Sequence, residues 1–109
     1  MEALALTLTI LFYSVIDGDT LHSNGIGIRL WGIDAPEMDS ADGNAARLAL
    51  IDITQDQMLI CNIRDIDSYG RIVAQCRLPD QTDVSCELVR RGAARDWPKY
   101  SGGAYRDCD

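Results

Sequence analysis

Apolar and polar residues alternate along several short segments of the chain, the pattern that a β-strand with one buried face produces. Asp17-Gly18-Asp19 breaks the first of these segments, and Asn24-Gly25 is a strong hairpin turn between the second and the third. The alternation predicts five strands, over residues 4–16, 20–23, 26–33, 57–66 and 71–78.

Two other segments have helical spacing. Ala, Leu and Ile recur at helical intervals after polar starting residues, which predicts a helix over residues 42–54. A shorter helix is expected within residues 83–94, opened by Asp83 or Ser85 and closed by Gly92. With one helix after the third strand and one or two near the C-terminus, we expect a mainly β, α+β protein that forms a five-stranded Greek-key barrel.

The length and composition are those of one globular domain, residues 1–109, with 47% apolar and 25% charged residues. No apolar run reaches the roughly 18 residues of a transmembrane helix, so no membrane span is expected. The segment LALTLTILFY (4–13) is similar to the apolar part of a signal peptide, but no Lys or Arg precedes it and its alternation favours a strand. Any signal sequence is therefore expected to have been removed.

The net charge is −7 and Lys99 is the single lysine, which argues against broad electrostatic attraction to a polyanion. A nucleic-acid function would have to rest on a local site, where a divalent cation offsets the carboxylates. The sequence indicates no protein partner.

Four cysteines in so short a chain favour disulfides. If the last two strands form a hairpin folded between Ser68 and Tyr69, Cys61 lies opposite Cys76, with the Cα atoms ~4.5–5.5 Å apart. This separation suits a disulfide, although a bulge would change the register.

Cys86 and Cys108 then pair by elimination, although sequence alone allows three connectivities. A zinc site is the alternative, but no cysteine lies two to four residues from another and His22 is the only histidine. Disulfides place the protein in an extracytoplasmic compartment, either periplasmic or secreted.

Several polar residues that the strand pattern does not require stand at or near strand breaks. Clustered carboxylates suit a hard cation, calcium above all, because calcium accepts irregular shells of oxygen ligands. Two arginines suit a phosphate, and a carboxylate beside the metal can orient or deprotonate water. These residue types predict a site for phosphodiester hydrolysis, and the candidates are Asp17, Asp19, Arg29, Asp34, Glu37 and Arg71.

Two considerations oppose this prediction. Strict alternation puts Arg29 and Asp34 on opposite faces of one strand, so their convergence needs a bend after Gly32. Each residue also has an ordinary explanation, such as turn formation around Gly18, a surface charge for Arg29, or solvent exposure for Glu37. The tryptophans are expected to be packing residues, and the residues alone leave both interpretations open.

Four motifs in this order, VIDGDTL (15–21), IRLWGIDAPE (28–37), DSYGRIVA (67–74) and ELVRRGAA (87–94), resemble the staphylococcal nuclease (thermonuclease) family. The chain looks most like the small bacterial secreted members that carry cysteines. The resemblance implies an OB-fold barrel with helices. It also implies calcium-dependent cleavage of DNA and RNA, single-stranded or denatured, that leaves a 3′-phosphate.

The resemblance also implies the metal ligands. They would be the carboxylates of Asp19 and Asp34 and the backbone carbonyl of Ala35, with Asp17 close by in the outer shell. Ala35 replaces a threonine of the type member, a change of little consequence because only the carbonyl is needed.

The catalytic roles follow from the same motifs. Glu37 would be the general base, and Arg29 and Arg71 would bind the phosphate and stabilise the transition state, with Tyr69 in support. Ser68 stands where the family often has a cation, which together with the acidic composition predicts weak, salt-sensitive substrate binding.

The family usually has a further helix that begins near AYRD (104–107), so the C-terminal helix is expected to be truncated. The alternative function is a non-catalytic module that binds nucleic acid or another ligand, tied to a cell-surface or exopolysaccharide pathway. Retention of Arg29, Glu37 and Arg71 argues against it, since a binding module has no need of a base.

Overall fold

The computed structural model describes residues 6–108. Its strands are β1 (Thr7–Ile10), β2 (Ser14–Asp17), β3 (Thr20–Ser23), β4 (Ile26–Leu30), β5 (Ile33–Asp34), β6 (Leu59–Ile66), β7 (Ile72–Arg77) and β8 (Arg95–Asp96). Its helices are α1 (Ala41–Thr54), α2 (Val84–Arg90) and α3 (Pro98–Ser101). None of these helices is long and apolar enough to cross a membrane.

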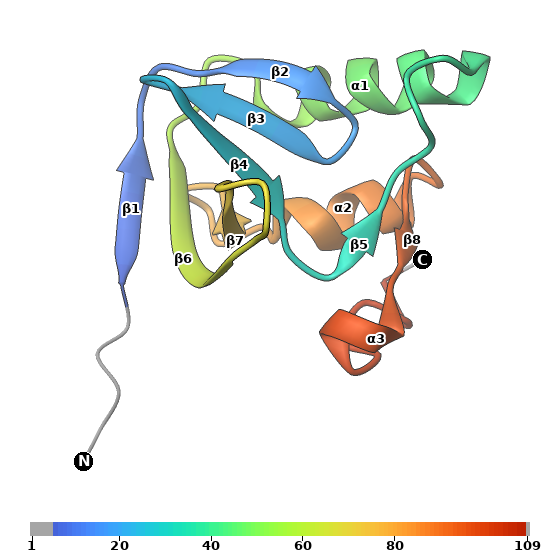
Figure 1. Ribbon diagram of the computed structural model, residues 1–109. Coiled ribbons are helices and arrows are strands. Elements are labelled where there is room, and N and C mark those ends of the chain that lie inside the picture. Colours follow the sequence, from blue (N-terminus) through green and yellow to red (C-terminus); the bar gives the residue numbers. More distant parts are fainter. Residues whose placement is uncertain (1–5, 109) are drawn as a thin grey trace.

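Six of the strands form one mixed sheet in the order β1-β6-β7-β4-β3-β2. β4 and β7 run parallel, and the other neighbours run antiparallel. β1 and β2 lie at opposite edges of the sheet, yet only residues 11–13 separate them along the chain. The sheet therefore curls into a half-barrel (Figure 1), and the expected α+β barrel fold is confirmed.

The first predicted strand is the main departure within this sheet. Residues 11–13 carry the chain from the edge beside β6 to the edge beside β3, so the described part of the segment forms two strands. One uninterrupted strand over residues 4–16 is therefore a wrong prediction, because a straight strand cannot pair along both edges. Residues 4 and 5 lie outside the described part of the chain.

The third predicted strand, residues 26–33, is interrupted where convergence of the candidate residues requires a bend. β4 ends at Leu30, and Trp31 and Gly32 form a turn in which Gly32 has a φ of +82°. A Cβ at Gly32 would also lie 2.8 Å from a ring carbon of Tyr105. β5 then leaves the main sheet and pairs with β8.

β6 and β7 form the predicted hairpin, with Cys61 opposite Cys76 and a disulfide between them. The turn is centred on Tyr69, because the Asp67 amide donates to the Arg71 carbonyl at 3.0 Å. A register shift between residues 63 and 65 compensates for this offset, so the strands regain the predicted register at the cysteines.

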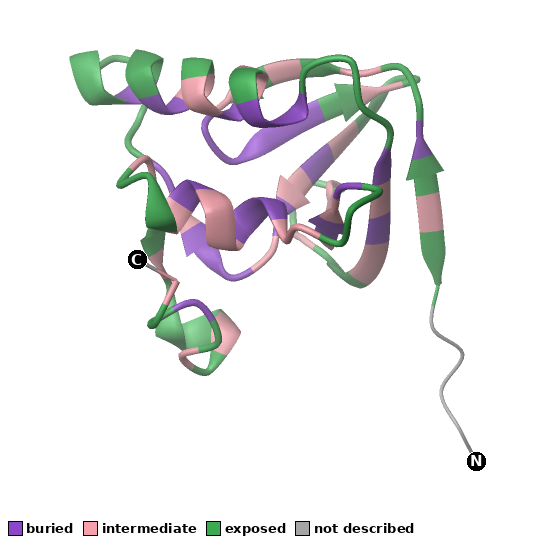
Figure 2. Cartoon of the chain, turned by 180° about the vertical axis from the view of Figure 1, so that it is seen from behind, coloured by how far each residue is buried: buried purple, intermediate pink, exposed green. Residues whose placement is uncertain are grey.

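α1 begins one residue earlier than predicted, because Ser40 caps it by accepting a hydrogen bond from the Gly43 amide at 3.0 Å. Its buried side faces the sheet and its opposite side is exposed (Figure 2). α2 is capped by Asp83, one of the two predicted residues, and ends at Arg90. The centre of the core consists of fully buried leucines, Leu21, Leu30, Leu50, Leu59 and Leu88.

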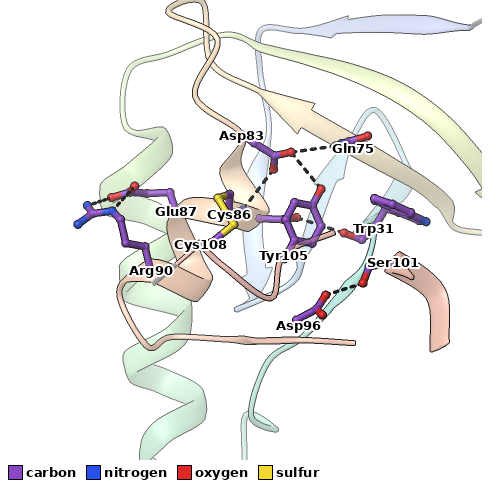
Figure 3. Close-up of a disulfide and its surroundings, with 11 residues drawn as sticks. Trp31, Gln75, Asp83, Cys86, Glu87, Arg90, Asp96, Ser101, Tyr105 and Cys108 are labelled. Atoms are coloured by element: carbon purple, nitrogen blue, oxygen red, sulfur yellow. Dashed lines mark hydrogen bonds and ion pairs between the residues drawn. A yellow bond between two sulfur atoms is a disulfide. The ribbon is translucent and has the colours of Figure 1, made fainter. Parts of the chain in front are cut away.

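The C-terminal segment packs against α2, and residues 104–107 form turns rather than a helix. The predicted disulfide between Cys86 and Cys108 is present, and beside it the buried Tyr105 hydroxyl donates to Asp83 Oδ2 at 3.0 Å (Figure 3). This anchoring holds β8 and α3 beside the turn after β4, and both elements lie in a segment whose sequence predicted only turns.

Candidate functional site

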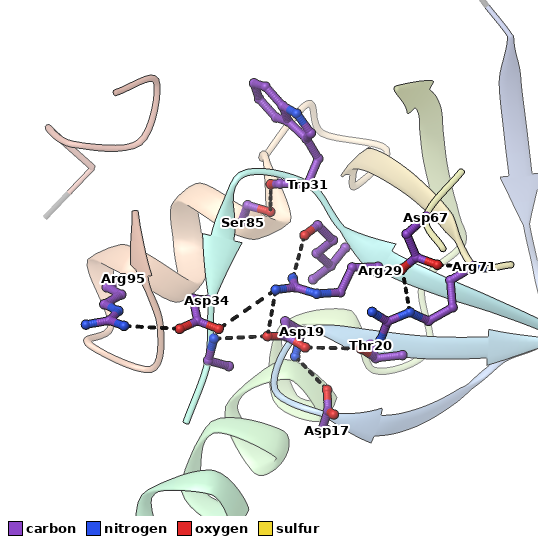
Figure 4. A network of polar contacts seen from close by, with 12 residues as sticks. Asp17, Asp19, Thr20, Arg29, Trp31, Asp34, Asp67, Arg71, Ser85 and Arg95 are labelled. Carbon is purple, nitrogen blue, oxygen red and sulfur yellow. Dashed lines mark hydrogen bonds and ion pairs between the residues drawn. The ribbon is translucent and has the colours of Figure 1, made fainter. Parts of the chain in front are cut away.

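The centre of the site is an arginine between two carboxylates. Asp19 directly precedes β3, and the pairing of β3 with β4 brings it close to Arg29. Arg29 Nη2 lies 3.4 Å from Asp19 Oδ2 and 3.9 Å from Asp34 Oδ1 (Figure 4). The bend at Gly32 thus brings Asp34 to the same side as Arg29, and the geometric objection raised by strict alternation does not hold.

Asp19 is a buried carboxylate with few neutral partners. It is 8% exposed, Oδ2 accepts from the Ala35 amide at 3.0 Å, and Oδ1 accepts from the Thr20 hydroxyl at 3.1 Å. Burial raises the pKa of Asp19 to about 6, against the opposing effect of Arg29. Its environment therefore favours the approach of a further positive charge.

Asp17 and Asp34 flank this centre. Asp17 Oδ1 accepts from the Asp19 amide at 3.1 Å, which makes Asp17 the turn former that holds Asp19 in place. Asp34 Oδ2 lies 3.3 Å from Nη2 of Arg95, its partner in the β5–β8 register. Sequence analysis did not single out Arg95, because only the pairing of two very short strands brings it to the site.

Glu37 lies in the exposed segment between β5 and α1. Its carbonyl accepts hydrogen bonds from the Ser40 amide at 3.1 Å and the Ser40 hydroxyl at 2.7 Å. A Cβ at Gly43 would lie 1.8 Å from the same carbonyl oxygen, so the Glu37 backbone rests directly on the first turn of α1. Within residues 6–108 the Glu37 carboxylate has no hydrogen-bond or ion-pair partner, and the residue is exposed.

Arg71 reaches the site from the hairpin turn. Its Nε donates to Asp67 Oδ2 at 2.7 Å, and its aliphatic part covers Gly27, where a Cβ would lie 3.0 Å from it. Burial opposes ionisation of Asp67, but hydrogen bonds from Arg71 and Tyr69 outweigh it and lower the Asp67 pKa. Arg71 is thereby held in one orientation, with Tyr69 exposed beside it.

A cleft of about 510 Å³ brings the two predicted phosphate-binding arginines together. Asp19, Asp34 and Glu37 do not line it. The charged and aromatic side chains that do are Arg29, Arg64, Arg71, Lys99, Asp65, Asp67, Trp31, Tyr69, Trp97 and Tyr100. Three of these residues were not predicted as site residues. Arg64 belongs to no motif, and Lys99 and Tyr100 begin a segment, KYSGGAY (99–105), that resembles the small secreted members of the family but to which no role was assigned. Both tryptophans were expected to be packing residues.

The predicted metal ligands are hard oxygen donors, and the two carboxylates among them lie on either side of the same guanidinium. Asp19 and Asp34 both lie within 4 Å of the Arg29 guanidinium, and the Ala35 amide is already bound to Asp19. No cluster of three or more His, Cys, Asp or Glu side chains in residues 6–108 is arranged to hold a metal ion. The set of two carboxylates and the Ala35 carbonyl nevertheless fits calcium, which accepts backbone carbonyls and water in its shell.

Comparison with known proteins adds an independent finding. Residues 27–107 match the family model described as staphylococcal nuclease homologue. The chain is 33% identical over 98 residues to a micrococcal nuclease from Shigella flexneri, an alignment that covers 79% of this chain and 56% of the relative.

Two further relatives have different names. An uncharacterized endonuclease from Escherichia coli is 32% identical over 91 residues, which is 80% of this chain and 60% of the relative. The succinoglycan biosynthesis protein ExoI from Rhizobium meliloti (strain 1021) is 32% identical over 103 residues, 84% of this chain and 54% of the relative. The chain thus spans less than two thirds of the length of each of these relatives.

Proposed function

The chain belongs to the family of staphylococcal nuclease homologues, and from this premise we propose that it is a calcium-dependent nuclease of low sequence specificity. Its substrates are DNA and RNA in single-stranded or denatured form. The observation that carries the proposal is Arg29, held between Asp19 and Asp34 at one end of a cleft that Arg71 also lines.

The two arginines bind the phosphate in this proposal. Arg29 Nη1 donates to the Leu30 carbonyl at 2.8 Å, and Asp67 holds Arg71, so both guanidinium groups are oriented before the substrate arrives. Oriented charges of this kind stabilise the negative charge that develops on a pentacoordinate phosphorus. Tyr69 supports the same phosphate from the hairpin turn.

Glu37 is the base. A water oxygen forms a bond to phosphorus and its proton passes to the Glu37 carboxylate. The bond from phosphorus to the 5′ oxygen breaks to leave a 3′-phosphate, and the departing 5′ oxygen takes the electron pair and a proton from solvent water to become a 5′-hydroxyl. Asp19, Asp34 and the Ala35 carbonyl would hold calcium, which would supply Lewis-acid polarisation of the phosphate when bound. Asp17 keeps Asp19 in position through its hydrogen bond from the Asp19 amide.

Two disulfides support an extracytoplasmic location, because such bonds form and persist in oxidising compartments. The alternative function is a non-catalytic module that binds nucleic acid or another ligand, and the name of ExoI, a succinoglycan biosynthesis protein, agrees with its tie to an exopolysaccharide pathway. Such a module would bind its ligand in the cleft, and Glu37 would have no catalytic role.

The test is cleavage of denatured DNA with calcium and with a chelator, by the wild type, Glu37→Gln and Asp39→Asn. Asp39 is the matched control, because it is an exposed carboxylate in the same segment. We expect cleavage only with calcium, a loss of about 10²–10⁴-fold in kcat for Glu37→Gln, and little change for Asp39→Asn. Absence of cleavage by a folded, disulfide-bonded sample would reject the nuclease and favour the binding module.

A further inference from the structure

Arg64 lines the cleft, but the proposed reaction gives this side chain no role. Its Cζ is 4.0 Å from the centroid of the Trp31 ring, so the guanidinium stacks closely on that ring. Trp31 in turn contacts Tyr105 edge-to-face, with the ring centroids 5.7 Å apart, and Tyr105 is buried and bonded to Asp83. The aromatic surface beneath Arg64 is therefore fixed to the core.

The hairpin geometry allows this placement. The register of β6 and β7 shifts between Ile63 and Asp65, so Arg64 is the unpaired residue of a bulge. A bulge redirects a side chain relative to the regular alternation of the strand. Arg64 is exposed, and the one hydrogen bond of its side chain within residues 6–108 is a long one, from Nη1 to Gln75 Oε1 at 3.4 Å.

The four cationic side chains in the cleft divide into two groups. Arg29 and Arg71 are paired with carboxylates, whereas Arg64 and Lys99 form no ion pair within residues 6–108. Lys99 Nζ lies 5.5 Å from the ring centroid of Tyr100, a residue of α3 that lines the same cleft. Asp65 is the one carboxylate lining the cleft that has no ion pair within residues 6–108, since Asp67 pairs with Arg71. The unpaired side chains of the cleft therefore carry a net positive charge in a chain whose net charge is −7, which favours an anionic ligand at that place.

We infer that Arg64 and Lys99 form a second phosphate-binding subsite, which holds a neighbouring phosphate of the strand whose scissile phosphate Arg29 and Arg71 bind. A guanidinium stacked on an aromatic face keeps its N–H edge free for phosphate oxygens. Arg64 and Arg71 also project from different points along the hairpin, so they suit two phosphates rather than one. The inference rests on the proposed nuclease function, and it makes a strand with several phosphates the preferred substrate.

The experiment compares thymidylyl-thymidine, which has one phosphodiester, with decathymidylate, at saturating calcium. For Arg64→Gln we expect about a tenfold higher KM on decathymidylate, with kcat and the dinucleotide kinetics unchanged. The slope of log(kcat/KM) against log[salt] for decathymidylate should become shallower by about 0.7, the value for one phosphate contact to a single strand. Arg64→Lys should fall between the wild type and Arg64→Gln, because it keeps the charge but loses the stacking.

Arg106→Gln is the matched control, because it removes the same charge from an exposed side chain outside the cleft. Arg64→Gln and Arg106→Gln with equal KM and equal salt slopes would overturn the subsite while leaving the nuclease intact. An equal loss on both substrates would also overturn it, since that result would place Arg64 at the scissile phosphate or in the fold.

A binding measurement tests the second phosphate subsite independently of the proposed cleavage reaction. The anisotropy of fluorescein-labelled decathymidylate in chelator measures affinity without cleavage, and Arg64→Gln should weaken it about tenfold relative to Arg106→Gln. A wild type that cleaves neither substrate but shows this difference rejects the nuclease and retains the subsite. Equal affinities of the two variants reject the subsite.

Discussion

At the scale of single residues, the site combines one buried charge with close backbone contacts. Asp19 is ionisable, nearly inaccessible, and only partly compensated by Arg29 at 3.4 Å. Glu37 is the opposite case, an exposed side chain whose backbone is fixed by Ser40 and Gly43. Burial of Asp19 lowers the stability of the fold and provides a charged group for binding. The position of Glu37 depends on the residues that contact its backbone.

Asp19→Asn should therefore stabilise the metal-free protein. A carboxylate whose pKa is raised in the folded state destabilises that state once it ionises, so the penalty grows as pH rises from the unfolded pKa of 3.8 to about 6. At pH 8 in chelator, we expect the free energy of unfolding to rise by about 3 kcal/mol in urea titrations. Asp39→Asn, at an exposed carboxylate, should change it little.

The same variant should lose calcium binding in isothermal titration calorimetry, because one of the two proposed carboxylate ligands is gone. A less stable Asp19→Asn protein in chelator would show that Arg29 and the hydrogen bonds outweigh burial. Unchanged calcium affinity would remove Asp19 from the metal site.

Gly43→Ala should slow catalysis without contacting substrate. The new Cβ would meet the Glu37 carbonyl at 1.8 Å, so the segment that carries the proposed base must move. We expect kcat to fall by at least about tenfold with a smaller change in KM, as expected when a proton acceptor is displaced. Asn44→Ala, at an exposed position in the same turn of α1, is the control.

An ordinary helical Gly→Ala change stabilises a protein by roughly 0.5–1 kcal/mol. A stabilised Gly43→Ala protein with normal kcat would therefore contradict the proposed positioning of Glu37 by α1.

At the scale of elements, the two disulfides connect different parts of the fold. Cys61–Cys76 joins neighbouring strands that already pair, whereas Cys86–Cys108 joins α2 to the C-terminal segment. That segment contributes Trp97, Lys99 and Tyr100 to the cleft. The second disulfide should matter for substrate binding as well as for stability.

Replacing Cys86 and Cys108 together by serine should thus raise KM for decathymidylate and lower the free energy of unfolding by about 3 kcal/mol, given the sequence separation of 22 residues. Replacing Cys61 and Cys76 by alanine should lower stability but leave KM unchanged in the remaining folded protein. Steady-state kinetics and urea titrations measure both effects. Equal KM values in the two double variants would show that the C-terminal segment stays in place without its disulfide.

The ion pairs at the C-terminal end of α2 predict a pH effect. Hydrogen bonds from Arg90 and then Arg91 lower the pKa of Glu87 to about 2, and Arg91 also pairs with Asp52 of α1 at 2.8 Å. A depressed carboxyl pKa stabilises the folded state above the unfolded value, 4.5, and this stability is lost as pH falls toward 2. Urea titrations from pH 5 to 2 should show a shallower decline for Glu87→Gln than for the wild type, and equal declines would contradict the effect.

At the scale of the whole molecule, charge is segregated. The chain has 17 acidic and 10 basic residues, yet the cleft is lined by four of the basic residues and by only two acidic ones. The basic residues are Arg29, Arg64, Arg71 and Lys99, and the acidic ones are Asp65 and Asp67. The acidic remainder repels a polyanion at long range, while the cleft attracts it at short range. This arrangement agrees with the prediction of weak, salt-sensitive substrate binding, which the salt slopes described above will measure.

The sequence by itself determined the features that depend on short-range pattern. Alternation and turn residues predicted the hairpin that places Cys61 opposite Cys76, and polar starting residues followed by apolar spacing marked the start of α1 within one residue. The order of four motifs identified the family before any geometry was known. These features are local because strand period, capping and turn chemistry act over a few residues.

Only the tertiary structure decided which distant residues meet. The bend at Gly32 brings Asp34 to Arg29, and curling of the sheet divides the first predicted strand in two. The disulfide to Cys108 and the bulge at Arg64 bring Lys99 and Arg64 into one cleft. Such meetings depend on pairings between residues far apart in the chain, which local preferences do not encode.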